Sequence, residues 1–349
     1  MPLSIRLCTD RDQWTAFLDV QAPHTFLQSW EWKTTNEKLG HKVIPLGIFE
    51  DTTLVGTALT IYMKARRGSF LLVPHGQIYR ESGMENRESS DEKTVWKLLI
   101  EEWQKLAKLH HAVCVRVCSL LANDETRQIL LHEHGFRPAP IHQHPELAWM
   151  LDLTASEEDL LKNARKTTRQ SLRKAEEAGM MVEFHTDTKG LDDFWKVYQT
   201  TVARQQFTPF SCAYLNTECE AFAQDGKLLI AIGRIQDKIV SAAIVVLAHG
   251  SAFYHHGASD QSHFSKIPAA HLLQWRIIQE VKRRGYQLYN FWGVVPETAI
   301  NHPWYGLSVF KRGFGGFEEA YLHAQDLVTS PRYWLTWVIE TVRRKRRGL

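Results

Sequence analysis

Two stretches of the chain, VIPLGIFEDTTLVGTALTIYM (residues 43–63) and LLIAIGRIQDKIVSAAIVVLA (residues 228–248), share one pattern and decide the fold. Runs of apolar, β-branched residues bounded by turn signals are typical of strands. We therefore predict two strands in each stretch, joined by a short polar turn that carries Asp51 in the first stretch and Asp237 in the second. Self-similarity within a chain indicates that one structural unit occurs twice.

The elements that follow each stretch also correspond. A third strand ends in His-Gly, an amphipathic helix with apolar side chains at helical spacing comes next, and a further strand closes the series. This order is similar to the core of GNAT acyltransferases. We therefore predict an α/β (α+β) fold of two tandem GNAT-like domains, with mixed, mostly antiparallel sheets flanked by helices. The segments are His75-Gly76, 92–109 and 113–121 in the first half, and His256-Gly257, 269–284 and 286–294 in the second.

The boundary between the halves follows the proline-rich stretch FRPAPIHQHP, residues 136–145, because proline punctuates regular structure. We assign residues 1–147 to domain 1, completed by a C-terminal segment from about 313 to 349, and residues 148–312 to domain 2. The C-terminal segment is predicted to form a strand over 317–328 and then a helix that begins near Pro331 and ends in RRKRRGL. These cations either complement the helix dipole or contact an anionic partner.

Composition is that of a folded protein. The 349 residues are 44% hydrophobic and 23% charged, with a net charge of +3. We expect a cytoplasmic protein, because the sequence has no apolar run of membrane-spanning length and its N-terminus lacks the apolar core of a signal peptide. The five cysteines show neither C-x-x-C nor a Cys/His series, so we expect reduced structural thiols. His255 and His256 have no third ligand at metal spacing, and we expect no metal site.

Several catalytic classes lack their sequence signals. The chain has no G-x-S-x-G elbow, no G-x-x-x-x-G-K-[ST] loop and no G-x-G-x-x-G before a helix. The stretches that correspond to the pyrophosphate loop of a coenzyme A acetyltransferase, residues 82–93 and 259–271, offer no run of glycine-freed backbone N–H groups. This argues against the simplest GNAT activity.

The strongest local charge feature lies in NARKTTRQSLRKAEEAG, residues 163–179. Helical spacing predicts that the side chains of Arg165, Arg169 and Arg173 share one face, with Lys166 beside them. Such a face is typical of phosphate recognition, either of RNA or of a nucleotide-linked substrate. Ordinary surface pairing with the acidic residues that follow is the alternative.

Two further cations are candidates for chemistry. Lys311 stands among aromatic residues in HPWYGLSVFKRGFGG, residues 302–316, where it could provide a fixed positive charge in a water-poor site. A lysine that extends its ammonium from a sheet edge into water is the alternative. Arg204 lies at a predicted helix end before a proline-containing loop, and such loops often carry ligand contacts.

Five segments, in this order, resemble the FemABX family over nearly the whole chain: FLQSWEW (26–32), RKTTRQSLRKAEEAG (165–179), FYHHGAS (253–259), LLQWRIIQEVKRRG with YNFWGV (272–294), and HPWYGLSVFKRGFGG (302–316). The resemblance implies tandem GNAT-like domains of the type without a coiled-coil arm. It also implies an aminoacyltransferase that takes an amino acid from aminoacyl-tRNA, with no other cofactor. The acceptor would be the stem peptide of a lipid-linked or UDP-linked peptidoglycan precursor.

The same resemblance implies roles for individual residues. Lys311 falls on the lysine that stabilises developing oxyanion charge, and Arg204 on an arginine near the phosphates of the precursor. Tyr254 and His256 fall along the same groove. The remaining substrate-binding candidates are Trp32, Lys38 and Tyr305, and the candidates for binding tRNA or phosphate are Arg165, Lys166, Arg169 and Arg173.

Two rival functions stay open at this point. One is a GNAT-like N-acyltransferase that uses coenzyme A or a carrier-protein donor, and the other is a non-catalytic RNA-binding protein that uses the arginine face. For the favoured function we expect a monomer that acts at the inner face of the membrane, with peripheral contact to it.

Overall fold

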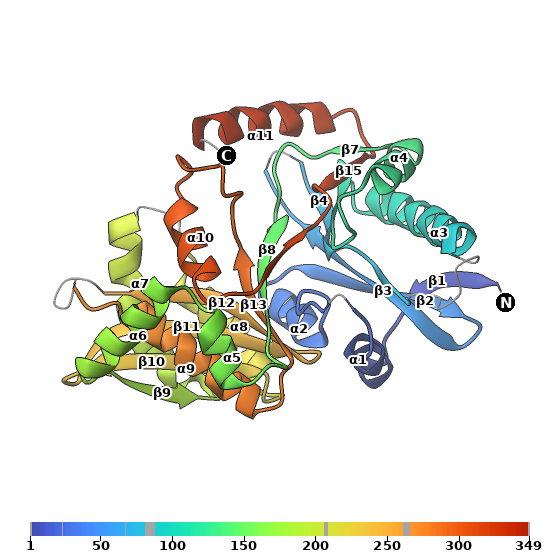
Figure 1. Ribbon diagram of the computed structural model, residues 1–349. Helices are drawn as coiled ribbons and strands as arrows, with labels where there is room; N and C mark the ends of the chain where they lie inside the picture. Colours follow the sequence, from blue (N-terminus) through green and yellow to red (C-terminus); the bar gives the residue numbers. More distant parts are fainter. Residues whose placement is uncertain are drawn as a thin grey trace. The chain divides into compact units, whose positions relative to one another are not determined.

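The computed structural model describes residues 2–22, 24–66, 68–80, 88–205, 209–260 and 266–347. The chain forms two compact units (Figure 1): unit 1 is Met1–Glu146 with Ala320–Leu349, and unit 2 is Leu147–Glu319. The sequence placed the first of these limits at 147 and the return to domain 1 at about 313. Among the described residues, no helix has both the length and the apolar character needed to cross a bilayer.

Unit 1 is built on one mixed sheet with the strand order β1-β2-β3-β4-β6-β15-β7 and with β5 paired to β3. β4 and β6 are parallel, and the other pairs are antiparallel. The strands are β1 (Leu3–Leu7), β2 (Lys42–Glu50), β3 (Thr53–Met63), β4 (Phe70–His75), β5 (Ile78–Tyr79), β6 (Cys114–Ser119), β7 (Phe136–Pro138) and β15 (Gln325–Val328).

The helices of unit 1 are α1 (Arg11–Asp19), α2 (Trp30–Lys38), α3 (Glu88–Leu109), α4 (Glu125–Glu133) and α11 (Tyr333–Arg347). The apolar side of α3 places Val95, Trp96, Leu99 and Trp103 in the same core as the sheet, which is the period of an amphipathic helix. The helix predicted over 92–109 is therefore confirmed.

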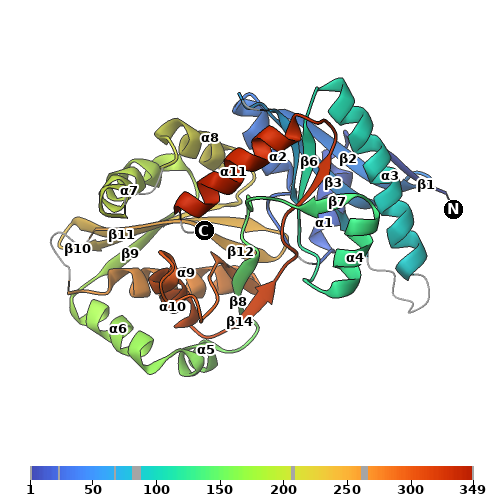
Figure 2. The same cartoon turned by 90° about the horizontal axis from the view of Figure 1, so that it is seen from above.

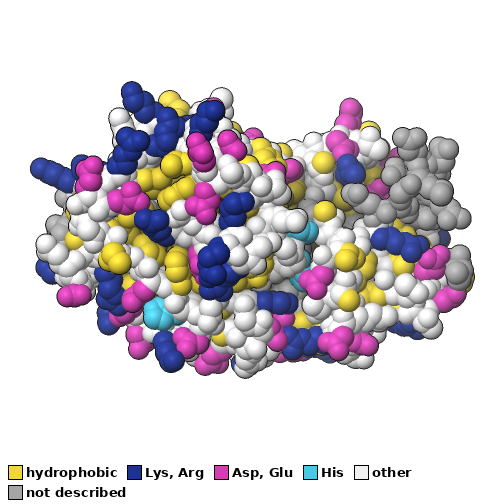
Figure 3. Space-filling model, turned by 60° about the horizontal axis from the view of Figure 1, so that its bottom comes forward, with side chains coloured by type: hydrophobic (Ala, Val, Ile, Leu, Met, Phe, Trp, Pro, Cys, Tyr) yellow, Lys and Arg dark blue, Asp and Glu magenta, His cyan; other side chains and the backbone are white. Residues whose placement is uncertain are grey.

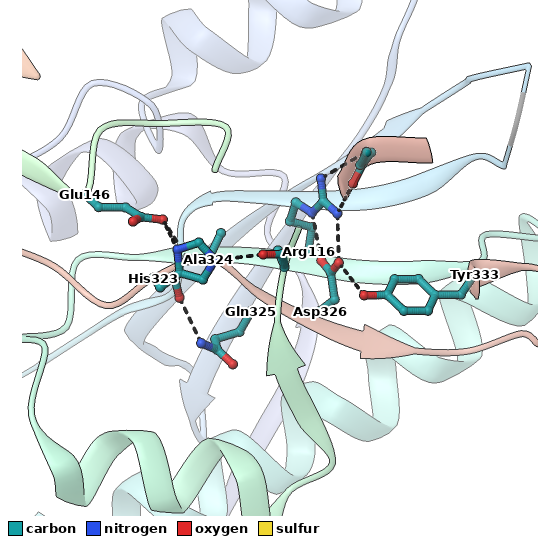
Figure 4. A network of polar contacts seen from close by, with 9 residues as sticks. Arg116, Glu146, His323, Ala324, Gln325, Asp326 and Tyr333 are labelled. Atoms are coloured by element: carbon teal, nitrogen blue, oxygen red, sulfur yellow. Dashed lines mark hydrogen bonds and ion pairs between the residues drawn. The ribbon is translucent and has the colours of Figure 1, made fainter. Parts of the chain in front are cut away.

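The C-terminal segment completes the sheet of unit 1. β15 lies between β6 and β7, and a buried ion pair fixes it there, because Arg116 of β6 donates hydrogen bonds of 2.7 and 2.8 Å to the two carboxylate oxygens of Asp326 (Figure 4). A planar guanidinium matches a carboxylate in this two-bond geometry. Both side chains are buried.

Unit 2 has a second sheet with the order β14-β8-β13-β12-β11-β10-β9. Helices cover both of its faces (Figure 2), with α7 and α8 on one side and α5, α6 and α9 on the other. Its strands are β8 (Leu147–Asp152), β9 (Met181–His185), β10 (Leu228–Ile235), β11 (Lys238–Ala248), β12 (Ser251–Ser259), β13 (Leu288–Gly293) and β14 (Phe317–Ala320). Its helices are α5 (Glu157–Asn163), α6 (Lys166–Glu177), the 3₁₀ turn Thr188–Gly190, α7 (Leu191–Gln205), α8 (Cys212–Ala223), α9 (Ala269–Arg283) and α10 (Tyr305–Arg312).

The two predicted hairpins are β2–β3 and β10–β11. The aspartates in their turns have positive φ angles, 54° at Asp51 and 62° at Asp237, a conformation that aspartate tolerates better than most residues and that tight hairpin turns require. The hairpins at the centre of the predicted duplication are therefore confirmed.

One predicted strand is wrong. Residues 317–328 do not form a single strand but two, with β14 in the sheet of unit 2 and β15 in the sheet of unit 1. Burial explains the difference, because all four residues of β14 are exposed while Gln325, Asp326 and Leu327 of β15 are buried. The first strand is thus a sheet edge, and the second is enclosed between two neighbours.

Candidate active site in unit 2

A β-bulge in β12 shapes the site. Along the pairing with β11, Val245 lies opposite Tyr254 and Ile244 lies opposite His256, so His255 is an extra residue in β12. A bulge of this kind bends the strand and re-aims the side chains beside it. Here two consecutive histidines contact the same partner.

That partner is Glu218 of α8, whose carboxylate is fully buried. Its two oxygens accept hydrogen bonds from Nε2 of His255 at 2.7 Å and from Nε2 of His256 at 2.9 Å. Burial raises the pKa of the Glu218 carboxyl, but the interactions with His255 and His256 outweigh burial and lower that pKa. Burial lowers the pKa of His256. Glu218 is therefore an ionised carboxylate that both imidazoles satisfy.

Glu218, His255 and His256 are also the one group of metal-ligand side chains found in the described part of the chain, with ligand atoms within 4.8 Å of one another. Nitrogen and oxygen ligands of a tetrahedral zinc ion lie about 2.0–2.2 Å from the metal and hence about 3.3 Å from one another. The observed separations of 2.7 and 2.9 Å are those of hydrogen bonds. The contacts therefore fit hydrogen bonding without a metal.

Lys311, the second feature of the site, lies in the last turn of α10. It is only 4% exposed, and its Nζ donates a 2.6 Å hydrogen bond to the carbonyl oxygen of Gly293 at the end of β13. Burial lowers the pKa of Lys311 to about 7. The ammonium is therefore held at a fixed backbone acceptor and is largely removed from water.

The ends of β12 and β13 connect Lys311 to the histidines. The two strands pair in parallel only from Ser251 to Phe253 on β12, and β13 then turns at Trp292, which has a φ of 68°. The ring of Trp292 lies edge-on to the His255 ring, with centroids 5.8 Å apart. Gly293, the acceptor for Lys311, follows Trp292 directly. We call the group Glu218, His255, His256, Trp292, Gly293 and Lys311 the β12–β13 site.

Tyr254 points away from these histidines. Its hydroxyl contacts Gln274 of α9, and burial raises the pKa of this tyrosine to about 12. A Cβ atom on Gly257 would stand 1.7 Å from the Tyr254 hydroxyl oxygen, so a larger residue there would force the Tyr254 side chain to move. Because Tyr254 is directed toward α9 and His256 toward α8, the structure does not place the two side chains in one groove, as the family resemblance had implied.

Arg204 lies near the end of β12. It is exposed, and its Nη2 donates a 3.1 Å hydrogen bond to the hydroxyl of Ser259, the last residue of that strand. Thr201, one turn earlier on α7, exchanges hydrogen bonds of 2.9 and 3.0 Å with the backbone of Ser259. The exposed guanidinium is thus held three residues beyond His256.

The basic face of α6 differs from the prediction at its first residue. Arg165 precedes the helix as its N-cap residue, with a φ of −56° and a ψ of 146°. Its N–H donates a 2.8 Å hydrogen bond to the carbonyl of Gly313, two residues after Lys311. Arg169 donates to the carbonyls of Ala164 and Lys162 at the end of α5. The prediction that three arginines share one face of a helix is therefore wrong, because Arg165 lies outside α6. Arg165, Lys166 and Arg173 are exposed, and Arg169 is half-buried.

Exposed cations alone do not mark a site on this protein. Figure 3 shows one face of the molecule, on which Lys and Arg side chains are interspersed with Asp and Glu. What distinguishes the start of α6 is its backbone contact with the segment that follows Lys311.

The remaining candidates have varied surroundings. Tyr305 is half-buried and is the first residue of α10, the helix that carries Lys311. Trp32 and Lys38 belong to unit 1. Trp32 is buried on α2 with its ring edge-on to Phe26, and Lys38 is exposed at the end of the same helix.

Sequence reasoning missed Glu218 and the turn at Trp292. A signal for Glu218 exists, because Leu215, Cys219 and Phe222 form the apolar stripe of α8 and Glu218 lies on that same side. An acidic residue on a buried stripe needs a partner in the fold. For Trp292 the sequence offers only the glycine that follows it.

Comparisons with known proteins agree with this architecture. Residues 162–311 match a family model described as an acetyltransferase (GNAT) domain. The chain is 19% identical to the lipid II:glycine glycyltransferase of Staphylococcus haemolyticus, over 92% of each protein, and 19% identical to that of Staphylococcus saprophyticus, over 95% of this chain and 94% of the relative. A crystal structure of FemX superimposes with a TM-score of 0.80 at 17% identity, covering 97% of this chain and 100% of FemX. The predicted tandem GNAT-like fold and the resemblance to the FemABX family are confirmed.

Proposed function

We propose that this chain is an aminoacyltransferase that adds an amino acid to the stem peptide of a peptidoglycan precursor, either lipid II or UDP-MurNAc-pentapeptide. The donor is aminoacyl-tRNA, and no other cofactor takes part. Similarity to two lipid II:glycine glycyltransferases and to FemX, each over more than nine-tenths of the chain, supports this class of reaction. The observation that carries the proposal is the buried ammonium of Lys311, held on Gly293 where β12 and β13 separate.

The reaction is the aminolysis of an ester. The primary amine of the acceptor attacks the carbonyl carbon of the aminoacyl ester, the C–O bond to the tRNA ribose breaks, and an amide forms. The amine loses one proton, and the departing ribose oxygen gains one. Alignment of amine and ester can supply roughly 7–11 kcal/mol of the barrier reduction in favourable cases.

Charge stabilisation is the part of this chemistry that a named side chain can perform. The carbonyl oxygen of the ester becomes anionic in the tetrahedral intermediate, and a fixed donor in a water-poor site is typically worth about 3–4 kcal/mol there. Lys311 is buried and positioned by its hydrogen bond to Gly293, so we assign it this role. The exposed cations Arg204, Arg165, Lys166 and Arg173 are proposed to contact the phosphates of the precursor and of tRNA.

The test is transfer by the purified full chain. A radiolabelled amino acid on tRNA is incubated with lipid II in one series and with UDP-MurNAc-pentapeptide in another, and the product is identified by mass spectrometry. We expect a product heavier than the acceptor by one amino-acid residue. No transfer from any charged tRNA, together with turnover of acetyl-coenzyme A, would establish the rival N-acyltransferase instead. Binding of uncharged RNA without turnover of any donor would establish an RNA-binding protein.

A further inference from the structure

Helix α11 is fixed in its rotation by two polar contacts within unit 1 (Figure 4). The hydroxyl of Tyr333 donates a 3.0 Å hydrogen bond to Asp326, and Glu340, seven residues further along α11, accepts a 2.8 Å hydrogen bond from Arg116. Residues seven apart lie on the same side of a helix. One side of α11 therefore faces the sheet of unit 1, and the opposite side faces away from that sheet.

The outward side carries a stripe of large apolar residues. The exposed fraction is 46% for Trp334, 61% for Leu335, 52% for Val338 and 43% for Val342. These positions are spaced by one, three and four residues, so they form one continuous strip along the helix. Single exposed apolar side chains are ordinary, but a contiguous group of four marks an interaction surface.

Positive charge follows the strip. The last turns of α11 read RRKRR, and the side chains of Arg343, Lys345 and Arg346 are exposed. The acidic residue of this helix, Glu340, is on the inner side with Arg116. The outward side of α11 thus combines apolar and cationic residues without a carboxylate.

We propose that α11 is a docking surface for an anionic lipid bilayer, on which the helix lies flat. The apolar strip would enter the interface, and the basic end would contact lipid headgroups. A helix of 15 residues is about 22 Å long, which is shorter than the roughly 30 Å hydrocarbon core, so it lies on the membrane rather than across it.

An anionic membrane matches both halves of this surface better than the alternatives do. RNA would use the cations and leave the apolar strip in water. A second copy of the chain could cover the strip but would bring a second basic end to it. The proposal concerns a surface of unit 1 and holds whether or not the proposed aminoacyl transfer is correct.

The experiment is co-sedimentation of the purified full chain with vesicles that contain no peptidoglycan precursor. Vesicles of phosphatidylethanolamine and phosphatidylglycerol are compared with vesicles of phosphatidylcholine. We expect binding to the anionic vesicles that weakens with salt, and little binding to the neutral ones. The triple variants L335Q/V338Q/V342Q and R343Q/K345Q/R346Q should each weaken binding roughly tenfold or more.

A matched control is available on α3 of the same unit, where Lys93, Lys97 and Lys105 are exposed. The variant K93Q/K97Q/K105Q removes the same charge and should bind almost as the unaltered protein does. All variants keep Tyr333 and Glu340, and unchanged thermal unfolding would show that α11 remains packed.

Three results would overturn the proposal. The first is equal sedimentation with and without anionic lipid. The second is equal loss in the α3 control and in the basic α11 variant. The third is the absence of vesicle binding together with another use of the surface. That use would be a dimer, measured by light scattering, that the apolar variant abolishes, or tRNA binding that the basic variant abolishes.

Discussion

Lys311 and Gly293 are joined by a 2.6 Å hydrogen bond from the lysine Nζ to the glycine carbonyl, although the lysine is only 4% exposed. Removing an ammonium from water is costly unless it is paired. A single carbonyl is modest compensation. We infer that a lysine at this position contributes to chemistry rather than to stability.

The first prediction concerns rate. Lys311→Ala should lower kcat for transfer from aminoacyl-tRNA by about 10²–10³-fold, the loss typical of removing one oxyanion donor. KM for the precursor should change little, because the interaction is made in the transition state. Lys311→Arg keeps the charge and serves as the matched variant. Equal kcat values for Lys311→Ala and the unaltered enzyme would remove Lys311 from the mechanism.

The second prediction concerns stability against pH. The pKa of Lys311 is about 7 in the folded protein and near 10.5 when exposed, so between these values the unfolded state binds more protons. Stability of the unaltered protein should therefore rise with pH across this window relative to Lys311→Met. At pH 6 the methionine variant should be the more stable by up to ~5 kcal/mol, since one pKa unit corresponds to about 1.4 kcal/mol. Denaturant unfolding at pH 6 and pH 10 measures this, and an identical difference at both would contradict it.

The local patterns of the fold could be predicted from the sequence. Strand alternation, turn aspartates and helical spacing are properties of neighbouring residues, and they located the β2–β3 and β10–β11 hairpins. The helix predicted over 269–284 is α9, Ala269–Arg283. The division of the C-terminal segment into two strands was not predicted. The structure explains it, because Gln325, Asp326 and Leu327 are the residues of this segment's second strand that become buried.

The site could be predicted only in part, because its contacts join distant residues. Lys311 was identified in the sequence by its aromatic neighbours and by the family resemblance. Glu218 is 37 and 38 residues from the histidines that it joins, and no local rule fixes such a pairing. Arg165 lies outside α6, and its backbone N–H donates to the carbonyl of Gly313, a partner that only the folded chain supplies.

The third prediction concerns close packing at Gly257. Gly257→Ala places a methyl group where the Tyr254 hydroxyl lies, with a separation of 1.7 Å, so we expect a loss of about 1–3 kcal/mol. The loss should shrink when Tyr254 is shortened to leucine, since neighbouring substitutions couple. A double-mutant cycle by denaturant unfolding measures the coupling. Additive losses would show that Tyr254 is not the residue in conflict.

The last prediction concerns the Glu218 pair of hydrogen bonds. Because their lengths of 2.7 and 2.9 Å fit hydrogen bonds without a metal, removing metal with a chelator should leave the unfolding temperature unchanged. Glu218→Gln should destabilise the protein by about 3 kcal/mol, because an amide cannot accept from both imidazoles as the carboxylate does and a buried charged network is broken. Glu220→Gln, a neighbouring acidic position on α8, is the control and should have a small effect. A zinc-dependent rise in unfolding temperature that Glu218→Gln abolishes would instead show that the three side chains bind a metal.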